Sequence, residues 1–404
     1  MKRTVVTAAF AAASFVFTAT AGMAQVYTRP INDFKDIKYP APFDKPQIAP
    51  EIPFEPVDAN WFKFPPATPN YNVDFGEVAA VTSNSKGHVF ALSRNDVSGN
   101  VHGASATEVL EFDEKGNFVR EIGHAQYGLG YGHGIRADKD DNIWVVDKGT
   151  NMVTKFNGVT GKVMMVLGRR DESTEAYWRE NPPDRERPAL EGRFGEPTDV
   201  AWDSKGNIYI SDGYIHSRIA KFDPDGHWIG TWGKRGVGES EFRTPHAIQI
   251  DANDHIWVGD RGNGRIQIFD TNGKYLRTII LNVPTKKYQP LLSHQYPPTG
   301  DTTLKDVKQP GLEPRPGTPY TLCSPPDNKK VMFVGDIYPG RIYKVDLSGK
   351  VLGYFGHVGK KPGDTGSLHG LACPNENTVY TAEFINDRVQ RFVLHPERAK
   401  VTGN

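Results

Sequence analysis

The stretch from residue 245 to residue 270, PHAIQIDANDHIWVGDRGNGRIQIFD, holds the pattern that decides the fold. Three short runs rich in Ile, Val and aromatic residues are separated by turns rich in Asp, Asn and Gly. β-Strands favour the residues of the runs, and tight antiparallel connections favour the residues of the turns. The stretch therefore predicts three consecutive antiparallel strands.

The same pattern recurs along most of the chain. The other copies begin near Gly76, His133, Pro197, Pro319 and His369. Each copy has room for four short strands, and regular repetition of such a unit predicts the blades of a propeller. Six copies predict an all-β fold, a six-bladed β-propeller whose repeats resemble the NHL type. An open β-solenoid and a pair of β-sandwiches are the alternatives. The segment around Trp61 is a candidate for the outer strand of the sixth blade.

The composition excludes several classes of function. The chain has 404 residues, and its 48 Lys and Arg balance its 48 Asp and Glu, so no excess of positive charge is present to bind nucleic acid. After the N-terminal segment, no apolar run approaches the roughly 20 residues of a transmembrane helix. We expect a small-molecule or peptide-derived substrate, no nucleic acid and no membrane span. A monomer is one option for the oligomeric state, which the sequence leaves open.

Residues 1–24 have the pattern of a secretory signal peptide. Lys2 and Arg3 precede an apolar run that ends in small residues, as in a cleavable leader. A periplasmic or secreted protein is therefore expected; the alternative is an N-terminal anchor that is not cleaved. The oxidising conditions outside the cytoplasm permit a disulfide between Cys323 and Cys373, but the spacing alone leaves open whether they pair.

The rest of the chain divides at the edges of the repeats. A Pro-rich arm, the propeller and a short tail are expected at residues 25–69, 70–396 and 397–404. Two insertions, residues 169–193 and 283–317, interrupt the repeat. Long loops of this kind are usually either functional rims or disordered segments, and we expect both at one mouth of the propeller.

Three histidines occupy one position of the repeat. Counting back 14 residues from the acidic residue that ends the second strand gives His133 from Asp147, His246 from Asp260 and His369 from Glu383. The same position holds Ala79, Thr198 and Tyr320 in the other three copies. The first strand of a propeller blade lines the central channel. The three imidazoles are therefore expected to converge on the axis from alternate blades.

Three imidazoles with an open fourth position are typical of a catalytic zinc site. Fe²⁺ and Mn²⁺ are alternatives to Zn²⁺, because the type of ligand does not separate these ions well. The alternative without a metal is a set of channel histidines that bind water or anions.

Three further residues follow the second strands. Arg94 and Arg261 come directly after the end of this strand in the first and fourth copies, and Tyr214 lies one residue further along in the third. Two guanidinium groups at this mouth suit a carboxylate or another anion, unless each pairs with a neighbouring Asp. Tyr214 could act as a general base if a metal and an arginine lower its pKa; the alternative is a packing role.

Acidic residues at the end of the second strand recur together with arginines. The acidic residues Asp147, Asp212, Asp260 and Asp336 recur together with Arg218, Arg265, Arg341 and Arg388. We interpret this recurrence as ion pairs and bonds between strands that hold each blade together.

Several segments resemble the peptidyl-α-hydroxyglycine α-amidating lyases. They are HGI at 133–135, ISDGY at 210–214, GDRGNGRIQIF at 259–269 and HGLA at 369–372, within a resemblance that covers roughly residues 76–394. The resemblance implies a six-bladed propeller with a zinc ion, and cleavage of a peptidyl-α-hydroxyglycine into a peptide amide and glyoxylate. It also implies the roles of six residues: His133, His246 and His369 as ligands, Tyr214 as the base, and Arg94 and Arg261 as assisting groups, one for the ionisation of Tyr214 and one for the substrate.

The chain departs from that family in its channel. The family also holds Ca²⁺ there, partly through an Asp directly after the third histidine, where this chain has Gly370. Ile135 would supply the backbone ligand. The missing carboxylate argues against calcium. The substrate also stays open: the alternatives are a different metal-dependent hydrolase or lactonase on the same propeller, and a non-catalytic NHL-repeat binding scaffold.

Overall fold

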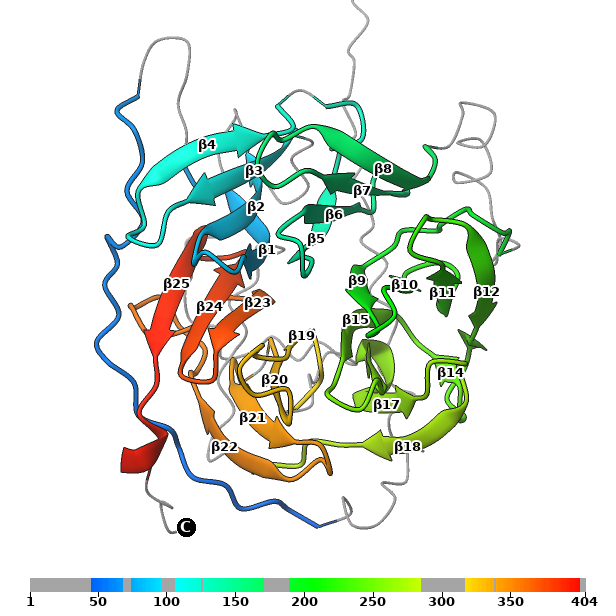
Figure 1. Ribbon diagram of the computed structural model, residues 1–404. Helices are drawn as coiled ribbons and strands as arrows, with labels where there is room; N and C mark the ends of the chain where they lie inside the picture. Colours follow the sequence, from blue (N-terminus) through cyan, green and yellow to red (C-terminus); the bar gives the residue numbers. More distant parts are fainter. Residues whose placement is uncertain are drawn as a thin grey trace, which may run out of the picture.

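Six antiparallel sheets form a ring around one axis, as the repeats predict (Figure 1). The computed structural model describes residues 45–67, 74–95, 106–124, 126–170, 189–284, 317–337 and 339–399. The expected signal peptide, most of both predicted insertions, the first part of the arm and the end of the tail lie outside the described residues.

The strands of each blade follow one another in sequence order, and the first strand of each blade contacts the first strands of its neighbours around the axis. Blades one to three comprise β1 (Glu77–Ser83), β2 (Val89–Asn95), β3 (Ala106–Phe112) and β4 (Phe118–Ile122); β5 (Gly132–Ala137), β6 (Ile143–Asp147), β7 (Met152–Phe156) and β8 (Val163–Gly168); and β9 (Asp199–Trp202), β10 (Ile208–Asp212), β11 (Arg218–Phe222) and β12 (Trp228–Trp232). Blades four to six comprise β15 (Pro245–Ile250), β16 (Ile256–Asp260), β17 (Arg265–Phe269) and β18 (Tyr275–Ile279); β19 (Thr321–Cys323), β20 (Val331–Gly335), β21 (Ile342–Asp346) and β22 (Val351–Phe355); and β23 (Leu368–Asn375), β24 (Thr378–Glu383) and β25 (Arg388–Val393).

Minor elements complete the described chain. The short strands β13 (Lys234–Arg235) and β14 (Glu241–Phe242) pair between the third and fourth blades. Two 3₁₀ turns, η2 (Arg261–Asn263) and η3 (Pro396–Arg398), follow β16 and β25. Within the described ranges, no helix has the length and apolar character needed to cross a membrane.

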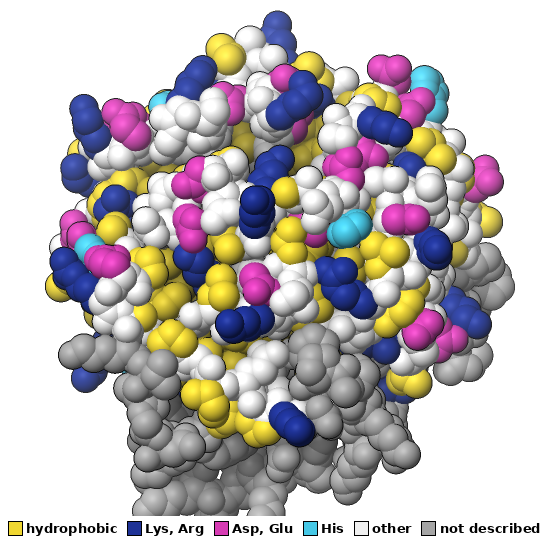
Figure 2. Space-filling view, turned by 60° about the horizontal axis from the view of Figure 1, so that its bottom comes forward, with side chains coloured by type: hydrophobic (Ala, Val, Ile, Leu, Met, Phe, Trp, Pro, Cys, Tyr) yellow, Lys and Arg dark blue, Asp and Glu magenta, His cyan; other side chains and the backbone are white. Residues whose placement is uncertain are grey.

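The core consists of six apolar layers, each between two neighbouring blades. In one of them, Phe90 and Leu92 of the first blade pack with Ile135 and Val145 of the second. Alternate residues of a strand point to opposite faces, and the two faces of each blade are covered by its two neighbouring blades. Each central strand is therefore apolar on both sides. Charged side chains of both signs are interspersed on the outer face shown in Figure 2.

The Asp-rich turns close the first hairpin of several blades by the same hydrogen bonds. In the third blade, Asp203 accepts from the backbone N–H groups of Lys205 and Asn207 at 3.0 and 2.9 Å. Gly206 between them has φ +84°, a conformation that only glycine adopts without strain. The hydroxyl of Tyr209 donates to the same carboxylate. The repeated Asp thus fixes both the turn and the strand that leaves it.

The sixth blade has three strands, and the N-terminal arm runs along its outer edge (Figure 1). Phe54 forms an antiparallel bridge with Leu394, directly after β25. The segment around Trp61 pairs instead with the first blade, through a parallel bridge between Lys63 and Asn117. The prediction that the segment around Trp61 forms the outer strand of the sixth blade is therefore wrong. An earlier part of the arm, around Phe54, lies along that blade instead.

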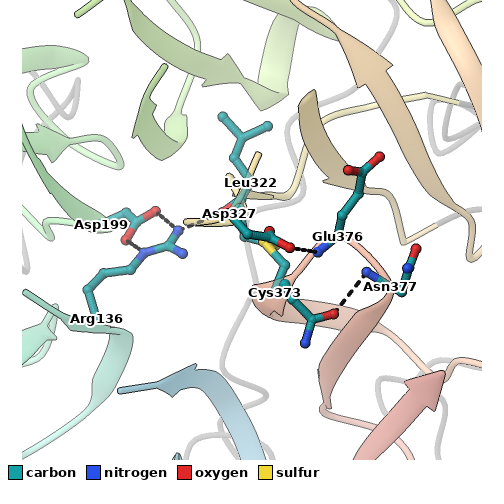
Figure 3. Close-up of a disulfide and its surroundings, with 9 residues drawn as sticks. Arg136, Asp199, Leu322, Asp327, Cys373, Glu376 and Asn377 are labelled. Atoms are coloured by element: carbon teal, nitrogen blue, oxygen red, sulfur yellow. Dashed lines mark hydrogen bonds and ion pairs between the residues drawn. A yellow bond between two sulfur atoms is a disulfide. The ribbon is translucent and has the colours of Figure 1, made fainter. Parts of the chain in front are cut away.

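Cys323 and Cys373 form a disulfide between the first strands of the fifth and sixth blades (Figure 3). Their Cα atoms are 6.1 Å apart, and the bond closes a loop with a sequence separation of 50. This pairing, which the sequence left open, joins two neighbouring blades beside the channel. A covalent closure of this length restricts the unfolded chain more than the folded one.

Replacing both cysteines, Cys323→Ser and Cys373→Ser together, should lower the free energy of unfolding by about 2–4 kcal/mol. Urea unfolding followed by circular dichroism measures the change. A reductant should destabilise the wild-type protein to a similar extent and leave the double variant unaffected. Equal stability of the variant and the oxidised wild type would contradict a stabilising role of the disulfide.

Candidate active site

Three imidazoles converge in the channel from alternate blades. His133 lies on β5, His246 on β15 and His369 on β23. Their ring centroids are 4.6 to 4.9 Å apart, and none of the three residues is more than 6% exposed. The three histidines that share one position of the sequence repeat therefore meet in the folded protein, as predicted.

Each of these histidines is oriented by a backbone carbonyl of the next blade. The Nδ1 atoms lie 2.8 Å from the oxygen of Thr198 for His133, 2.7 Å from that of Tyr320 for His246, and 2.6 Å from that of Ala79 for His369. A carbonyl oxygen only accepts, so each Nδ1 carries the proton and each Nε2 keeps a lone pair. The acceptors are the residues at the equivalent repeat position of the other three blades.

These imidazoles have the chemistry of a metal-binding set. Candidate ligand atoms of the three residues lie within 4.8 Å of one another. Burial lowers the pKa of all three histidines well below the ordinary value, and nearby positive charge lowers it further. The rings are therefore neutral at neutral pH and able to donate a lone pair. Hydrogen-bonded, neutral imidazoles of this kind fit a divalent ion such as Zn²⁺, with Fe²⁺ and Mn²⁺ as open alternatives.

Tyr214 reaches the same point from the turn after β10. Its hydroxyl lies 3.1 Å from Nε2 of His133 and 3.2 Å from Nε2 of His246. Burial raises the pKa of Tyr214, but positive charges led by those of Arg261 and Lys148 outweigh this effect, so the pKa lies below its ordinary value. The surroundings of this hydroxyl therefore make it easier to ionise than an ordinary tyrosine.

Arg261 approaches this hydroxyl from the fourth blade. Its Nη1 lies 3.4 Å from the oxygen of Tyr214, and its guanidinium lies 5.2 and 4.9 Å from the ring centres of Tyr214 and Tyr320. Among the described residues, no carboxylate lies within ion-pair distance of Arg261. The pairing with a neighbouring Asp that we considered therefore does not occur for Arg261 within this part of the chain, and its charge is available to an anion.

Arg94 is held differently. Its Nη1 donates to Glu77 at 2.8 Å, and its Nε donates to the carbonyl of Gly132 at 2.9 Å. The guanidinium also lies 3.8 Å from the ring centre of Tyr131, and the residue is 1% exposed. Arg94 thus pairs with an acidic neighbour, Glu77 rather than an Asp. Its Nε and Nη1 are thus engaged by the protein, so it contributes mainly positive charge to the site.

Lys148 is a cation at this mouth that the sequence reasoning missed. Its Nζ lies 4.1 Å from the ring centre of Tyr214 and 4.0 Å from a carboxylate oxygen of Glu196. It occupies the same repeat position as Arg94 and Arg261. Lys148 and Arg261 directly follow β6 and β16, whereas Arg94 lies within the last residues of β2. Aligning cations of both kinds, rather than arginines alone, would have found it.

The acidic residues that end the second strands have structural partners. Nε of Arg218, Arg265 and Arg388 donates to Asp212, Asp260 and Glu383 at 2.9, 2.8 and 3.2 Å. Arg341 is the exception, because its side chain donates to the carbonyl of Pro284 at 3.0 Å while the hydroxyl of Tyr343 donates to Asp336. The ion pair expected between the side chains of Asp336 and Arg341 is therefore wrong; only the backbone N–H of Arg341 bonds to Asp336.

The channel does not fit the calcium ion that the resemblance implies. Gly370 offers no side-chain ligand, and a Cβ added there would lie 2.7 Å from the Cα of Ala80. An Asp at this position would require β1 and β23 to move apart. Ile135, the expected backbone ligand, lines a small cavity together with Arg136 and Asp199. A calcium site consists of oxygen ligands, whereas this level of the channel also holds a positively charged guanidinium.

Comparisons with known proteins find an NHL repeat and several relatives named as amidating enzymes. The NHL repeat family matches residues 242–269. A probable peptidyl-alpha-hydroxyglycine alpha-amidating lyase of Caenorhabditis elegans is 29% identical over 50% of this chain. The chain resembles the amidating lyases. A peptidylglycine alpha-amidating monooxygenase of Rattus norvegicus is also 34% identical over 35% of this chain. The resemblance inferred from the sequence motifs is thus confirmed.

These similarities cover less than two thirds of each relative. The matched stretch is 57% of the nematode protein and 14% of the rat protein. A crystal structure of a protein of unknown function from Bacteroides thetaiotaomicron has a TM-score of 0.51, over 80% of this chain and 71% of that chain, at 13% identity. At this identity the structural likeness shows the fold alone, because one fold can carry many different activities.

The His246→Ala variant should lose the metal, because two imidazoles bind a divalent ion far more weakly than three. Elemental analysis should find about one equivalent of transition metal in the wild-type protein and less than roughly a tenth of that in the variant. His255→Ala is the matched control, since His255 lies in a turn outside the channel and pairs with Asp251. Loss of the metal from the control, or full retention by His246→Ala, would contradict the assignment of the ligands.

Proposed function

We propose that this protein is an exported, metal-dependent lyase that cleaves the N–Cα bond of an α-hydroxyglycine-type carbinolamide, with an amide and glyoxylate as products. The observation that carries the proposal is the hydroxyl of Tyr214, which lies against two converging imidazoles and the guanidinium of Arg261. The relatives named as amidating lyases support the same class of reaction.

The carboxylate of such a substrate would meet two cations at the mouth of the channel. Arg261 and Lys148 both lie near the ring of Tyr214 and are both partly exposed. A guanidinium binds a carboxylate through two parallel hydrogen bonds, and an ammonium adds a point charge. A substrate held in this way presents its hydroxyl to Tyr214.

Tyr214 is the proposed general base. Its phenolate takes the proton of the substrate hydroxyl, the electron pair left on that oxygen forms the carbonyl of glyoxylate, and the N–Cα bond breaks. The proton then passes to the departing amide nitrogen, so atoms and charges balance without an oxidant. The three histidines would hold a divalent ion, with zinc as the proposed metal, and such an ion supplies Lewis-acid polarisation of a substrate oxygen.

Two features support export. The pattern of residues 1–24 is typical of a signal peptide. The disulfide between Cys323 and Cys373 is of a kind that persists in oxidising compartments. A periplasmic or secreted location follows from this proposal.

The Tyr214→Phe variant removes the base and keeps the ring. We expect glyoxylate release from an N-acyl-α-hydroxyglycine to slow at least 100-fold, the usual contribution of a general base, while the metal content stays at the wild-type level. Tyr131→Phe is the matched control at the same mouth and should keep the rate close to that of the wild type.

Two results would count against the lyase. A Tyr214→Phe variant with unchanged turnover would remove Tyr214 from the role of base. A fully metal-loaded wild-type protein that releases no glyoxylate would favour a hydrolase, a lactonase or a binding scaffold.

The Lys148→Met variant tests the second cation. Loss of a positive charge beside Tyr214 raises the pKa of that hydroxyl, so the rising limb of the kcat–pH profile should move to higher pH. Loss of a charge-assisted contact should raise KM about tenfold. Steady-state kinetics at several pH values measure both effects. Lys155→Met, on β7 away from the mouth, should change neither, and a Lys148→Met profile identical to that of the wild type would exclude this role.

A further inference from the structure

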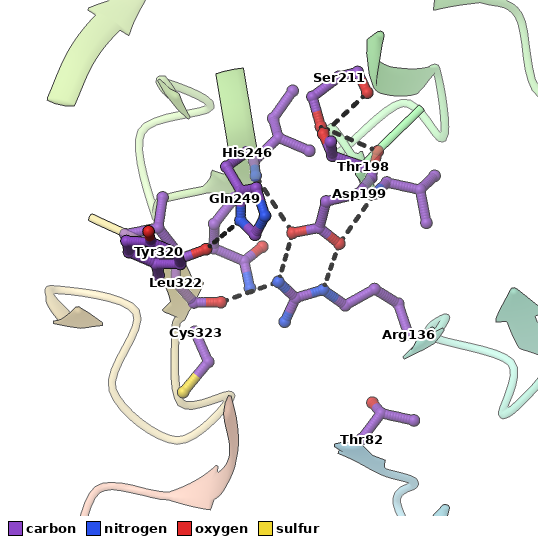
Figure 4. A network of polar contacts seen from close by, with 12 residues as sticks. Thr82, Arg136, Thr198, Asp199, Ser211, His246, Gln249, Tyr320, Leu322 and Cys323 are labelled. Carbon is purple, nitrogen blue, oxygen red and sulfur yellow. Dashed lines mark hydrogen bonds and ion pairs between the residues drawn. The ribbon is translucent and has the colours of Figure 1, made fainter. Parts of the chain in front are cut away.

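The channel holds a second charged cluster that the proposed reaction does not use. Arg136 lies on β5, three residues after a ring histidine, and Asp199 is the first residue of β9. Nε and Nη2 of Arg136 donate to the two carboxylate oxygens of Asp199 at 2.9 and 2.6 Å (Figure 4). Their side chains are only 12% and 7% exposed. This is a bidentate, nearly buried ion pair on the axis of the propeller.

The carboxylate of Asp199 has no lone pair left for another cation. Its Oδ1 also accepts from the backbone N–H of Val200 at 2.9 Å, and its Oδ2 accepts from the backbone N–H of Ile248 at 3.1 Å. Each oxygen therefore accepts two hydrogen bonds. A carboxylate has about four acceptor positions, and all of them are filled.

Arg136 also joins blades across the channel. Its Nη2 donates to the carbonyl of Leu322 on β19 at 2.9 Å. Figures 3 and 4 show this guanidinium between Asp199 and Leu322. One side chain of the second blade thus binds the third and fifth blades, and Asp199 adds the fourth through Ile248.

Asp199 lies at the same level of the channel as Gly370. Asp199 directly follows Thr198, just as Gly370 directly follows His369, and Thr198 and His369 occupy equivalent repeat positions. Both residues line one cavity of about 20 Å³, room for about one water molecule. Gly370 itself has no space for a carboxylate, because its Cα faces the backbone of Ala80.

We infer that the guanidinium of Arg136 takes the place of a calcium ion in this channel. The charge that a bound cation would supply is attached covalently to β5, and its carboxylate partner comes from Asp199 in a different blade. The protein therefore binds no calcium at this level, and neither its fold nor its histidine ring depends on calcium. This inference is independent of the proposed reaction, because its measurements are calcium content and thermal unfolding.

The wild-type protein provides the first test. After dialysis against calcium-free buffer, elemental analysis should find no calcium, and excess CaCl₂ should leave the Tm unchanged. An ion that binds only the folded state, present at a concentration of 100 times its Kd, would raise the Tm measurably. About one calcium per chain, or a rise of the Tm on addition of CaCl₂, would overturn the inference.

Variants of the pair provide the second test. Arg136→Met leaves Asp199 buried without its cation, so the Tm should fall by roughly 5 °C or more. Excess CaCl₂ should recover part of this loss, because two lone pairs of Asp199 become free. The Tm of the double variant Arg136→Met and Asp199→Asn should not change when CaCl₂ is added. An Arg136→Met protein as stable as the wild type would contradict the role of the pair.

Two further variants keep this test decisive. Arg265→Met breaks a comparably buried pair with Asp260 outside the channel, so its Tm should not respond to CaCl₂. If Arg136→Met does not fold, Arg136→Lys keeps the positive charge without the bidentate fork. It should fold with a lowered Tm and no response to CaCl₂, and a calcium-dependent Arg136→Lys protein would overturn the inference.

Discussion

Hydrogen bonds between imidazoles and backbone carbonyls hold the centre of this propeller. Six equivalent positions meet around the axis; three carry histidine and the other three present a carbonyl oxygen. The bonds join the second blade to the third, the fourth to the fifth and the sixth to the first. Because a carbonyl only accepts, the same bonds leave the three Nε2 lone pairs unprotonated at the axis. The interaction that links neighbouring blades therefore also creates the candidate metal-binding set.

Charge is arranged in levels along this axis. At the mouth, Arg261 and Lys148 are partly exposed and flank Tyr214, so positive charge remains available to an anionic substrate. The histidines are neutral because burial lowers their pKa. Beyond them, Arg136 and Asp199 compensate one another, as buried charges must. Net positive charge is thus left where a carboxylate would enter, and the deeper channel is closed by a neutral pair.

Close approach of the innermost strands limits which residues can lie beside the ring. A Cβ at Gly134 would lie 2.7 Å from the carbonyl oxygen of Thr198, and one at Gly370 would lie equally close to the Cα of Ala80. Side chains at this level therefore come from the few positions where the strands leave space. Asp199 is one of them, and the long side chain of Arg136 reaches it from the neighbouring blade.

The sequence by itself determined the propeller, the convergence of His133, His246 and His369, and the nearness of Tyr214, because repetition fixes the level of each residue along its strand. It did not determine partners across the channel, since these depend on the separation of blades and on the direction of long side chains. Only the tertiary structure showed that Arg94 is engaged by Glu77 and that Cys323 pairs with Cys373. The same holds for Arg136 and Asp199, which are 63 residues apart and meet only when the ring closes.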